Sequence, residues 1–377
     1  MKRALPFLMV FCLMLSLCAC GGKTEQPDDS GNSAANGGAD TVNSDAASAA
    51  APLSPVDGMR VALIPGAADD PLYAAAKSGA QSYAAQWGLE LRCADELGQT
   101  AAIQQAMDEG VSAICVASDD VPALRDKLRE ATDAGICVCT WGADTASDVR
   151  ALAVSEGTAS VLSSMLVEMG VTSLREREKD VSEEILYIWN ASQEDNAETK
   201  AWYAAAKEYI RDNYPAWVEY DGPYYADGES GGAVAAGQRA LEECPGVDLV
   251  LCGDPAALTG MCHAAMDMGM TAADVTITGF CQPSSMLAYL SAGVCTRWGL
   301  WDCGMQSAMS CYLAAWLAAG NEVHVGEVVN IPLIGSVELL ANSILDPEAE
   351  TRPVNSGVVM LPERVVFTAE NARDYHF

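Results

Sequence analysis

The sequence predicts an α/β protein built from two doubly wound, Rossmann-like lobes, and three observations lead to this prediction. Short apolar runs alternate with amphipathic stretches of helical length, a pattern typical of βαβ units and parallel sheets. The alternation begins at Met59, and a second series of it begins near Leu152. The patterned part of the chain is about 320 residues long, which exceeds what a single hydrophobic core usually holds.

Each element of the first series follows from its hydrophobic spacing. Arg60 to Pro65 is an apolar run of strand length, and Pro71 to Trp87 repeats Ala and Tyr at helical spacing. The same criteria predict strands at 89–94, 113–118 and 136–141 and helices at 100–109 and 122–134.

The second series repeats the pattern and ends in an unusually apolar stretch. Its predicted strands are 184–190, 218–220, 248–252 and 275–280, and its predicted helices are 158–170, 196–213, 232–243 and 255–269. The apolar stretch 303–320 contains Gln306, Ser307 and Ser310 and is shorter than the roughly 20 residues that cross a bilayer. We therefore expect it to be a buried helix.

Residues 1–19 carry the features of a signal peptide. Lys2 and Arg3 precede an apolar core from Leu5 to Leu17, and small residues lie just ahead of Cys20. This arrangement resembles a bacterial lipoprotein signal. The resemblance implies that Cys20 becomes the lipidated first residue of a mature protein held at the extracytoplasmic face of the membrane. An ordinary cleaved signal and a short uncleaved anchor are the alternatives.

Residues 20–57 are predicted to form a flexible tether. Between residues 21 and 55 the chain is dominated by Gly, Ser, Ala, Asn, Asp and Thr, which bury too little apolar surface to offset the entropy lost on ordering. The folded part therefore begins near residue 58.

The charge of the chain excludes nucleic acid as a partner. With 21 Lys and Arg against 52 Asp and Glu, the formal net charge is −31, so a polyanion would be repelled.

The 14 cysteines do not predict a disulfide scaffold. Cys12 and Cys18 lie in the signal and Cys20 carries the lipid, which leaves an odd number, eleven. Several of the eleven lie within apolar runs, where a free Cys behaves as a small buried hydrophobe. We expect most of them to be core thiols, with room for one oxidised pair.

A search for catalytic motifs finds none. The chain lacks a phosphate-binding loop, a dinucleotide fingerprint after the first strand, a zinc-protease motif and a nucleophile elbow. Its three histidines do not have metal-ligand spacing. We expect a binding protein with no cofactor, no metal and no enzymatic activity.

Candidate ligand-binding residues follow the predicted strands, because ligands of open α/β sheets bind beyond the carboxyl ends of the strands. The candidates are Asp70, Tyr73, Trp141, Asp144, Asn190, Asp254 and Gln282. Aromatic faces next to carboxylates and amides suit a neutral, polyhydroxylated, sugar-like molecule.

An Asp at a strand end also has a structural interpretation, since it often caps the following helix. Capping or a surface position is favoured for Asp119 and Asp120. Both interpretations stay open for Asp254, because Pro255 follows it as the first residue of a predicted helix.

Two segments resemble a known family. Gly299 to Asp302 and the ending from Val358 to Phe367 are similar to the autoinducer-2 (AI-2) and rhamnose binding-protein group, within the type I sugar-binding proteins of ABC importers. Further similarities occur in the same order along the chain, at 64–65, 79–81, 140–141, 202–217 and 278–280. The resemblance covers nearly all of residues 60–377.

The resemblance implies a clamp with two lobes and a three-crossing hinge, the type I periplasmic binding protein fold. The crossings are expected near 144–150, near 281–283 and after 320, and Trp301 and Asp302 are expected at the hinge. One lobe would contain 58–145 and 281–325, and the other 146–280 and 326–377. The implied partners are a small sugar-like molecule and the subunits of an ABC permease, with the protein acting as a monomer.

The residues that bind AI-2 in that group are mostly replaced here. The group has a Lys where this chain has Gly66, an Asp at Gly142, an Asp-Gln pair at Glu198 and Thr199, and a Pro and an Ala at Gly253 and Pro255. Because discrimination depends on paired polar groups, we expect the fold to carry over and AI-2 not to be the ligand.

Two other functions stay open at this point. A sensing protein that signals through a membrane receptor would have the same cleft. An enzyme of the glycosidase type would need two carboxyl groups held across a scissile bond.

Overall fold

The computed structural model describes residues 55–66, 71–94, 96–118, 122–194, 196–226 and 232–375. The predicted signal, most of the tether and Cys20 lie outside the described residues, as do Asp70, Asp119 and Asp120. The chain divides into two units at Ala51 and Pro52, and the description below concerns the second unit.

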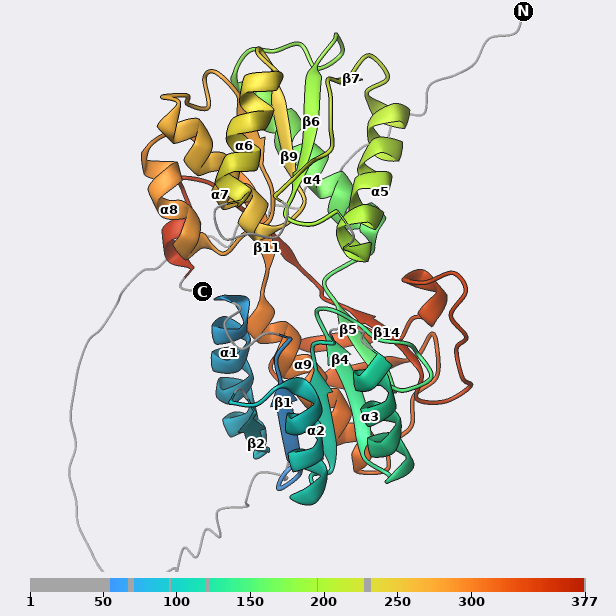
Figure 1. The fold of residues 1–377 in the computed structure, drawn as a ribbon. Coiled ribbons are helices and arrows are strands. Elements are labelled where there is room, and N and C mark those ends of the chain that lie inside the picture. The colour runs from blue at the N-terminus through green and yellow to red at the C-terminus, as the bar shows by residue number, and fades with distance from the viewer. Residues whose placement is uncertain are drawn as a thin grey trace, which may run out of the picture. The chain divides into compact units, whose positions relative to one another are not determined.

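The second unit contains two parallel sheets covered by helices, which confirms the predicted fold class (Figure 1). The sheet of the first lobe has the order β14-β5-β4-β3-β1-β2, with every pair parallel. Its strands are β1 (Arg60–Ile64), β2 (Glu90–Cys93), β3 (Ala113–Val116), β4 (Cys137–Trp141), β5 (Leu152–Ser155) and β14 (Gly357–Met360).

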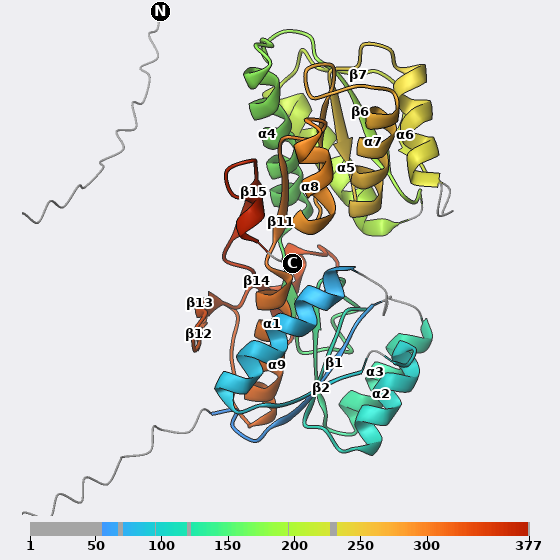
Figure 2. The same cartoon turned by 90° about the vertical axis from the view of Figure 1, so that its left-hand side faces the viewer.

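Helices cover both faces of the first sheet, α1 and α9 on one side and α2 and α3 on the other (Figure 2). Their bounds are α1 (Pro71–Trp87), α2 (Gln99–Asp108), α3 (Pro122–Asp133) and α9 (Cys303–Ala318). Helices α1 and α9 cross closely at two glycines, since a Cβ on Gly79 would lie 2.3 Å from Cα of Gly304. Small residues at this crossing let the backbones meet.

The second lobe has a five-stranded sheet in the order β10-β9-β6-β7, with β8 also paired to β6. Its strands are β6 (Leu186–Ala191), β7 (Val218–Glu219), β8 (Tyr224–Tyr225), β9 (Leu249–Cys252) and β10 (Thr276–Thr278). Its helices are α4 (Ala159–Glu176), α5 (Ala197–Asn213), α6 (Gly232–Glu243), α7 (Pro255–Asp267) and α8 (Pro283–Ser291). Helix α4 packs beside α5, and α6 packs beside α7.

A two-stranded antiparallel ribbon is separate from the two sheets. Its strands are β11 (Trp298–Trp301) and β15 (Arg364–Phe367). Trp301 ends β11, and Asp302 caps α9 by accepting a hydrogen bond from the backbone N–H of Met305 at 2.8 Å. Both residues therefore belong to the segment that links the lobes.

The strand pairing differs from the expected lobe boundaries. Strands β5 and β14 lie in the sheet of the first lobe, although both were expected in the second. Helix α8 packs against α7 of the second lobe, although it was expected in the first. The first crossing therefore lies after β5, which ends at Ser155, and not near 144–150. The second lies after α8, which ends at Ser291, and not near 281–283.

The apolar stretch near the end of the chain is a buried helix, as predicted. Helix α9 lies against β1, β3, β4 and β5, and its residues are almost all buried. Within the described ranges, no helix combines the length and the apolar character that crossing a bilayer requires.

The remaining elements extend the first lobe and the ribbon. A hairpin of β12 (Val328–Ile331) and β13 (Gly335–Glu338) follows α9, and two short 3₁₀ helices lie at Asn342–Ile344 and Ala372–Asp374. The eleven cysteines from Cys93 to Cys311 are free thiols and nine of them are buried, which agrees with the prediction of core thiols.

Candidate functional site

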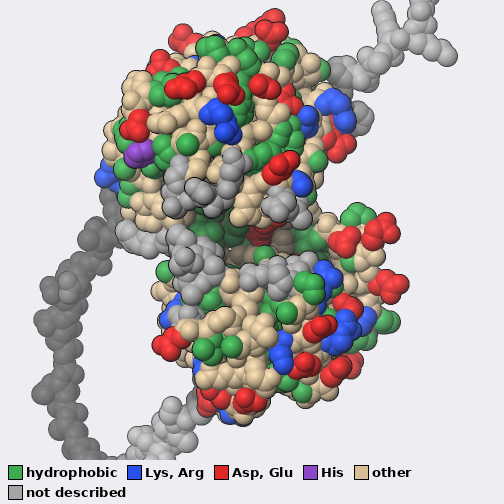
Figure 3. Space-filling view, in the orientation of Figure 1, with side chains coloured by type: hydrophobic (Ala, Val, Ile, Leu, Met, Phe, Trp, Pro, Cys, Tyr) green, Lys and Arg blue, Asp and Glu red, His purple; other side chains and the backbone are tan. Residues whose placement is uncertain are grey.

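A cavity of about 400 Å³ lies at the carboxyl ends of three strands of the first lobe and is bounded on its other side by α5 of the second lobe. Figure 3 shows the surface hollowed between the lobes. The lining residues come from the ends of β3, β4 and β5, from the first turns of α4 and α5 and from the segment after β13: Ser118, Gly142, Ala143, Asp144, Ser155, Glu156, Gly157, Ala159, Asn196, Glu198, Ala201, Trp202 and Leu345.

Local hydrogen bonds fix the segments that carry the key side chains. Where β5 ends, the hydroxyl of Ser155 accepts a hydrogen bond from the N–H of Gly157 at 3.1 Å, and the resulting turn carries Glu156. At the start of α5, Oδ1 of Asn196 accepts from the N–H of Thr199 at 2.9 Å. This cap fixes the turn that carries Glu198, and Trp202 follows one turn later on the same helix face.

Two carboxyl groups line the cavity, one from each lobe. Glu156, which is 5% exposed, comes from the end of β5, and Glu198 comes from the first turn of α5. Burial, and then the charge of Glu198, raise the pKa of Glu156 well above its usual range. Glu156 therefore keeps its proton at a pH at which an ordinary glutamic acid has lost it.

A chain of hydrogen bonds connects Glu156 to the ribbon. The side-chain amide of Gln306, on α9, donates at 2.9 Å both to Oε2 of Glu156 and to the backbone carbonyl of Val154. Its oxygen accepts from the indole N–H of Trp301 at 3.1 Å, which fixes the orientation of the amide. The carboxyl group of Glu156 is thus held in place by three elements.

An aromatic cluster forms one wall of the site. The ring of Trp202 lies 5.5 Å from that of Phe280 and 6.4 Å from that of Trp301, both in edge-to-face geometry. Packing of this kind fixes the orientation of the Trp202 ring, which lines the cavity. A fixed indole provides an apolar surface for the C–H face of a ligand.

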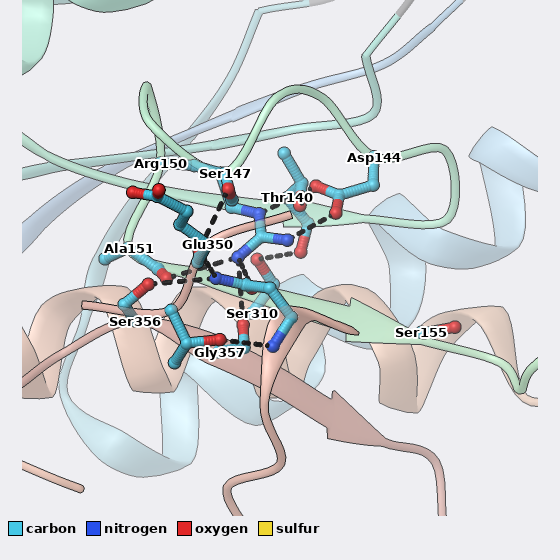
Figure 4. A network of polar contacts seen from close by, with 12 residues as sticks. Thr140, Asp144, Ser147, Arg150, Ala151, Ser155, Ser310, Glu350, Ser356 and Gly357 are labelled. Carbon is cyan, nitrogen blue, oxygen red and sulfur yellow. Dashed lines mark hydrogen bonds and ion pairs between the residues drawn. The ribbon is translucent and has the colours of Figure 1, made fainter. Parts of the chain in front are cut away.

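Asp144 lines the cavity, but Arg150 already binds its carboxylate (Figure 4). Arg150 donates from Nε at 2.9 Å and from Nη2 at 2.6 Å, and the hydroxyl of Thr140 donates to the same carboxylate. Nη1 of Arg150 donates to Oδ1 of Asn342 at 2.7 Å and to the carbonyl of Gly357. The pair therefore joins β4 to the segment that leads into β14, and Asp144 has a structural role whatever it binds.

Tyr73 and Trp141 lie together, as expected for neighbouring strand ends. Their rings are stacked with centroids 6.4 Å apart, and both side chains are buried. Neither lines the cavity described above. The indole N–H of Trp141 is buried and has no partner among the described residues, so a role in holding a ligand stays a prediction.

The three candidates of the second lobe have partners within the protein and do not line the cavity. Asp254 caps α7 by accepting from the N–H of Ala257 at 2.8 Å, and it also accepts from the N–H and the hydroxyl of Ser192. Asn190 is 1% exposed and donates to the carbonyl of Ala257, whereas its Oδ1 has no partner in the described part of the chain. Gln282 donates to the hydroxyl of Ser285 at 2.8 Å.

The candidates from the sequence therefore fall into two groups, those that line the cavity and those that do not. The structure brings Asp144 to the cavity and places Tyr73, Trp141, Asn190, Asp254 and Gln282 elsewhere, and Asp70 lies outside the described residues. Sequence reasoning missed Glu156 and Trp202 as site residues. Glu156 follows a strand directly, as the other candidates do, but β5 was not predicted and its end was not searched.

Nothing in the described ranges forms a metal centre, since no three His, Cys, Asp or Glu side chains gather there in a way that could hold an ion. The side chain of His263 is 45% exposed, and its Nε2 lies 3.6 Å from Oδ2 of Asp267, one turn later on α7. It is a surface residue.

Comparisons with known proteins agree with this architecture. The family model described as a periplasmic binding protein domain matches residues 61–322. LsrB from Clostridium saccharobutylicum, solved in complex with AI-2, is 40% identical, with a TM-score of 0.76 and a match that covers 85% of this chain and 100% of that one.

More distant solved structures share the fold. An ABC transporter solute-binding protein from Clostridium phytofermentas with bound L-rhamnose is 19% identical, with a TM-score of 0.66 over 84% of this chain and 99% of that one. A solute-binding protein from Burkholderia graminis in complex with D-arabinose is 14% identical, with a TM-score of 0.62 over 85% and 99%. On the family match and the 40% identity, this chain belongs to the periplasmic binding protein family, whose members are extracytoplasmic ligand-binding proteins.

Proposed function

We propose that this protein is an extracytoplasmic solute-binding lipoprotein that captures a small, uncharged, sugar-like molecule and delivers it to an ABC import permease. The cavity between the lobes carries this proposal. Its volume of about 400 Å³ lies within the range of roughly 300–1,000 Å³ that small-molecule sites occupy.

The chemistry of the lining supports a neutral polyhydroxylated ligand. Ser118, Asp144, Glu156 and Glu198 offer oxygen atoms from both lobes, and Trp202 offers an apolar face. None of the described residues that line the cavity is a Lys or an Arg. A phosphate or carboxylate group would therefore meet carboxyl groups without a compensating cation, which disfavours a phosphorylated sugar.

The ligands of the similar proteins indicate a class of ligand for this protein, but not a single compound. The proteins that this chain resembles were solved with AI-2, L-rhamnose and D-arabinose, and the last two are small neutral sugars. The replacements at Gly66 and Gly142 remove polar side chains that the AI-2 group uses, so we favour a sugar over AI-2. Anchoring through a lipid on Cys20 would keep the protein beside its permease, and the protein performs no bond chemistry itself.

The experiment is a thermal-shift screen of the mature protein against L-rhamnose, D-arabinose, AI-2 and L-rhamnose 1-phosphate. A ligand at about 100 times its Kd adds about 2.7 kcal/mol of stability. We expect a neutral sugar to raise the melting temperature and the phosphorylated sugar to leave it unchanged.

Variants locate the site. Trp202→Ala should lose the sugar-induced shift, measured against its own ligand-free melting temperature, because it removes the wall of the cavity. Tyr220→Ala, an exposed aromatic that does not line the cavity, is the matched control and should keep the shift. A full shift in Trp202→Ala would move the binding site elsewhere, and a preference for the phosphorylated sugar would refute a neutral ligand.

A further inference from the structure

A loop of the first lobe supplies one apolar side chain to the cavity between the lobes. The loop consists of residues 341–356, between β13 and β14, and is called the rim loop below. Its two ends meet, because the N–H of Leu340 donates to the carbonyl of Val358 at 2.8 Å and the N–H of Val358 donates to the carbonyl of Leu340 at 2.9 Å. The rim loop residue that lines the cavity is Leu345.

Leu345 does not belong to the hydrophobic cores. Its side chain is half-buried, yet it is neither a member of the two clusters of apolar side chains that form the cores nor packed against them. Among the described residues that line the cavity, the apolar side chains larger than that of Ala are Leu345, from the first lobe, and Trp202, from the second. The apolar surface of Leu345 therefore serves the cavity and not the core.

Asn342 holds the rim loop together from within. It is 1% exposed, and its side-chain amide donates to the carbonyl of Glu350 at 2.8 Å and to the hydroxyl of Ser356 at 3.0 Å. Its backbone carbonyl accepts from the N–H groups of Leu345 and Asp346 at 3.0 Å and 3.2 Å. Asn342 thus connects both arms of the rim loop to the turn that carries Leu345.

Arg150 ties Asn342 to the cavity wall of the first lobe (Figure 4). Nη1 of Arg150 donates to Oδ1 of Asn342 at 2.7 Å, while Nε and Nη2 bind the carboxylate of Asp144, which also lines the cavity. Arg352, in the other arm of the rim loop, donates to the carbonyl of Arg150 at 2.7 Å. One buried guanidinium therefore positions two lining side chains, Asp144 directly and Leu345 through Asn342.

We propose that Leu345 is a solute-contacting residue, and that Arg150 and Asn342 are positioning residues that hold it against the C–H surface of the bound sugar. This inference rests on the proposed function and adds to it an apolar contact from the first lobe, besides that of Trp202. A solute with a charged or strongly polar group at this surface is rejected, because that group would lose its water without gaining a hydrogen bond.

The first test measures the contact. Leu345→Asn replaces the apolar side chain by a polar one of similar size, so the Kd of the panel sugar with the largest thermal shift should rise about tenfold in calorimetry. The heat capacity change of binding should become less negative, because less apolar surface is buried. Ile344→Asn is the matched control, since Ile344 is the neighbouring residue, is 41% exposed and does not line the cavity. Unchanged binding in Leu345→Asn would overturn the contact.

The second test measures the positioning and needs no solute. Asn342→Asp keeps the acceptor for Arg150 but loses the two bonds that the amide donates, so hydrogen exchange of the peptide with Leu345 and Asp346 should quicken about tenfold. Ser343→Ala, an exposed residue of the same turn, is the control and should exchange like the wild type.

Two further variants keep this test decisive if Asn342→Asp folds poorly. Ser356→Ala removes one of the two donated bonds, and the single ammonium of Arg150→Lys cannot bind Asp144 and Asn342 in the same geometry. Both should quicken exchange in the rim loop while leaving α5 unchanged. Wild-type exchange in the rim loop of these variants would refute the positioning role.

The third test joins the two results in a double variant. Because Asn342 acts through Leu345, Asn342→Asp combined with Leu345→Asn should bind the sugar no more weakly than Leu345→Asn alone. Additive losses would show that Asn342 acts independently of Leu345 and would overturn the proposal. Failure of every panel sugar to bind the wild type would refute the proposed function and the contact with it, while the exchange experiment would still decide whether Asn342 positions the rim loop.

Discussion

At the scale of single residues, the ion pair of Asp144 and Arg150 gives a direct prediction. The Arg150 side chain is 2% exposed and binds both carboxylate oxygens. Arg150→Ala leaves a half-buried carboxylate without its cation, and breaking a buried pair in this way costs about 3–5 kcal/mol. The free energy of unfolding, measured in urea, should fall by an amount in that range.

A second ion pair provides the control for this measurement. Arg129 and Asp148 lie 2.6 Å apart on the surface of the first lobe, with about half of each side chain exposed. Solvent and salt screen such a pair, so Arg129→Ala should cause little measurable change. Equal losses in the two variants would contradict the structural role of Arg150.

The same residues show how far the sequence determines the site. The position of Asp144 and Asp254 at strand ends was predicted, because hydrophobic runs mark where strands stop. Their hydrogen-bond partners were not predicted. Ser192, 62 residues away, donates to the carboxylate of Asp254, and the sequence contains no signal for that contact. Glu156 and Glu198 could not be placed in one cavity for the same reason, since both line it only through the arrangement of two lobes.

At the scale of elements, the packing of α1 on α9 depends on two glycines. A Cβ on Gly79 would approach Cα of Gly304 to 2.3 Å, and this atom is backbone that cannot rotate away. Gly79→Ala should therefore push the helices apart and cost about 1–3 kcal/mol of unfolding free energy, despite the better helix propensity of Ala.

The control is on the same helix. Ser78 is exposed, so Ser78→Ala adds helix propensity without a clash and should leave the unfolding free energy unchanged or slightly higher. The free energy of unfolding of both variants is measured by chemical denaturation. Wild-type stability in Gly79→Ala would mean that the close crossing does not constrain the first lobe.

Individual elements were predicted better than their assembly. Helices such as Pro71–Trp87 and Gly232–Glu243 match their predicted ranges, because a clear helical period is a local signal. Strand β5 was not predicted, and its segment was expected in the wrong lobe, because strand pairing joins segments far apart in the sequence: β5 lies beside β14, about 200 residues later. The hairpin of β12 and β13 was not predicted at all.

At the scale of the whole molecule, the two lobes contribute opposite walls to one cavity. The cavity wall of the first lobe is braced by Arg150 and Gln306, and the wall of the second lobe comes from the start of α5, together with Ala159 at the start of α4. Movement of α5 relative to the first lobe would therefore open and close the cavity with little change inside either lobe. Family membership and the resemblance of the sequence to sugar-binding proteins agree with such a motion.

The measurement that tests this account most directly is small-angle X-ray scattering of the mature protein with and without the sugar that raises its melting temperature. The radius of gyration should fall when the sugar binds, and Trp202→Ala should show no such fall. Identical scattering profiles with every sugar of the panel, at concentrations that saturate a thermal shift, would contradict closure around a small solute.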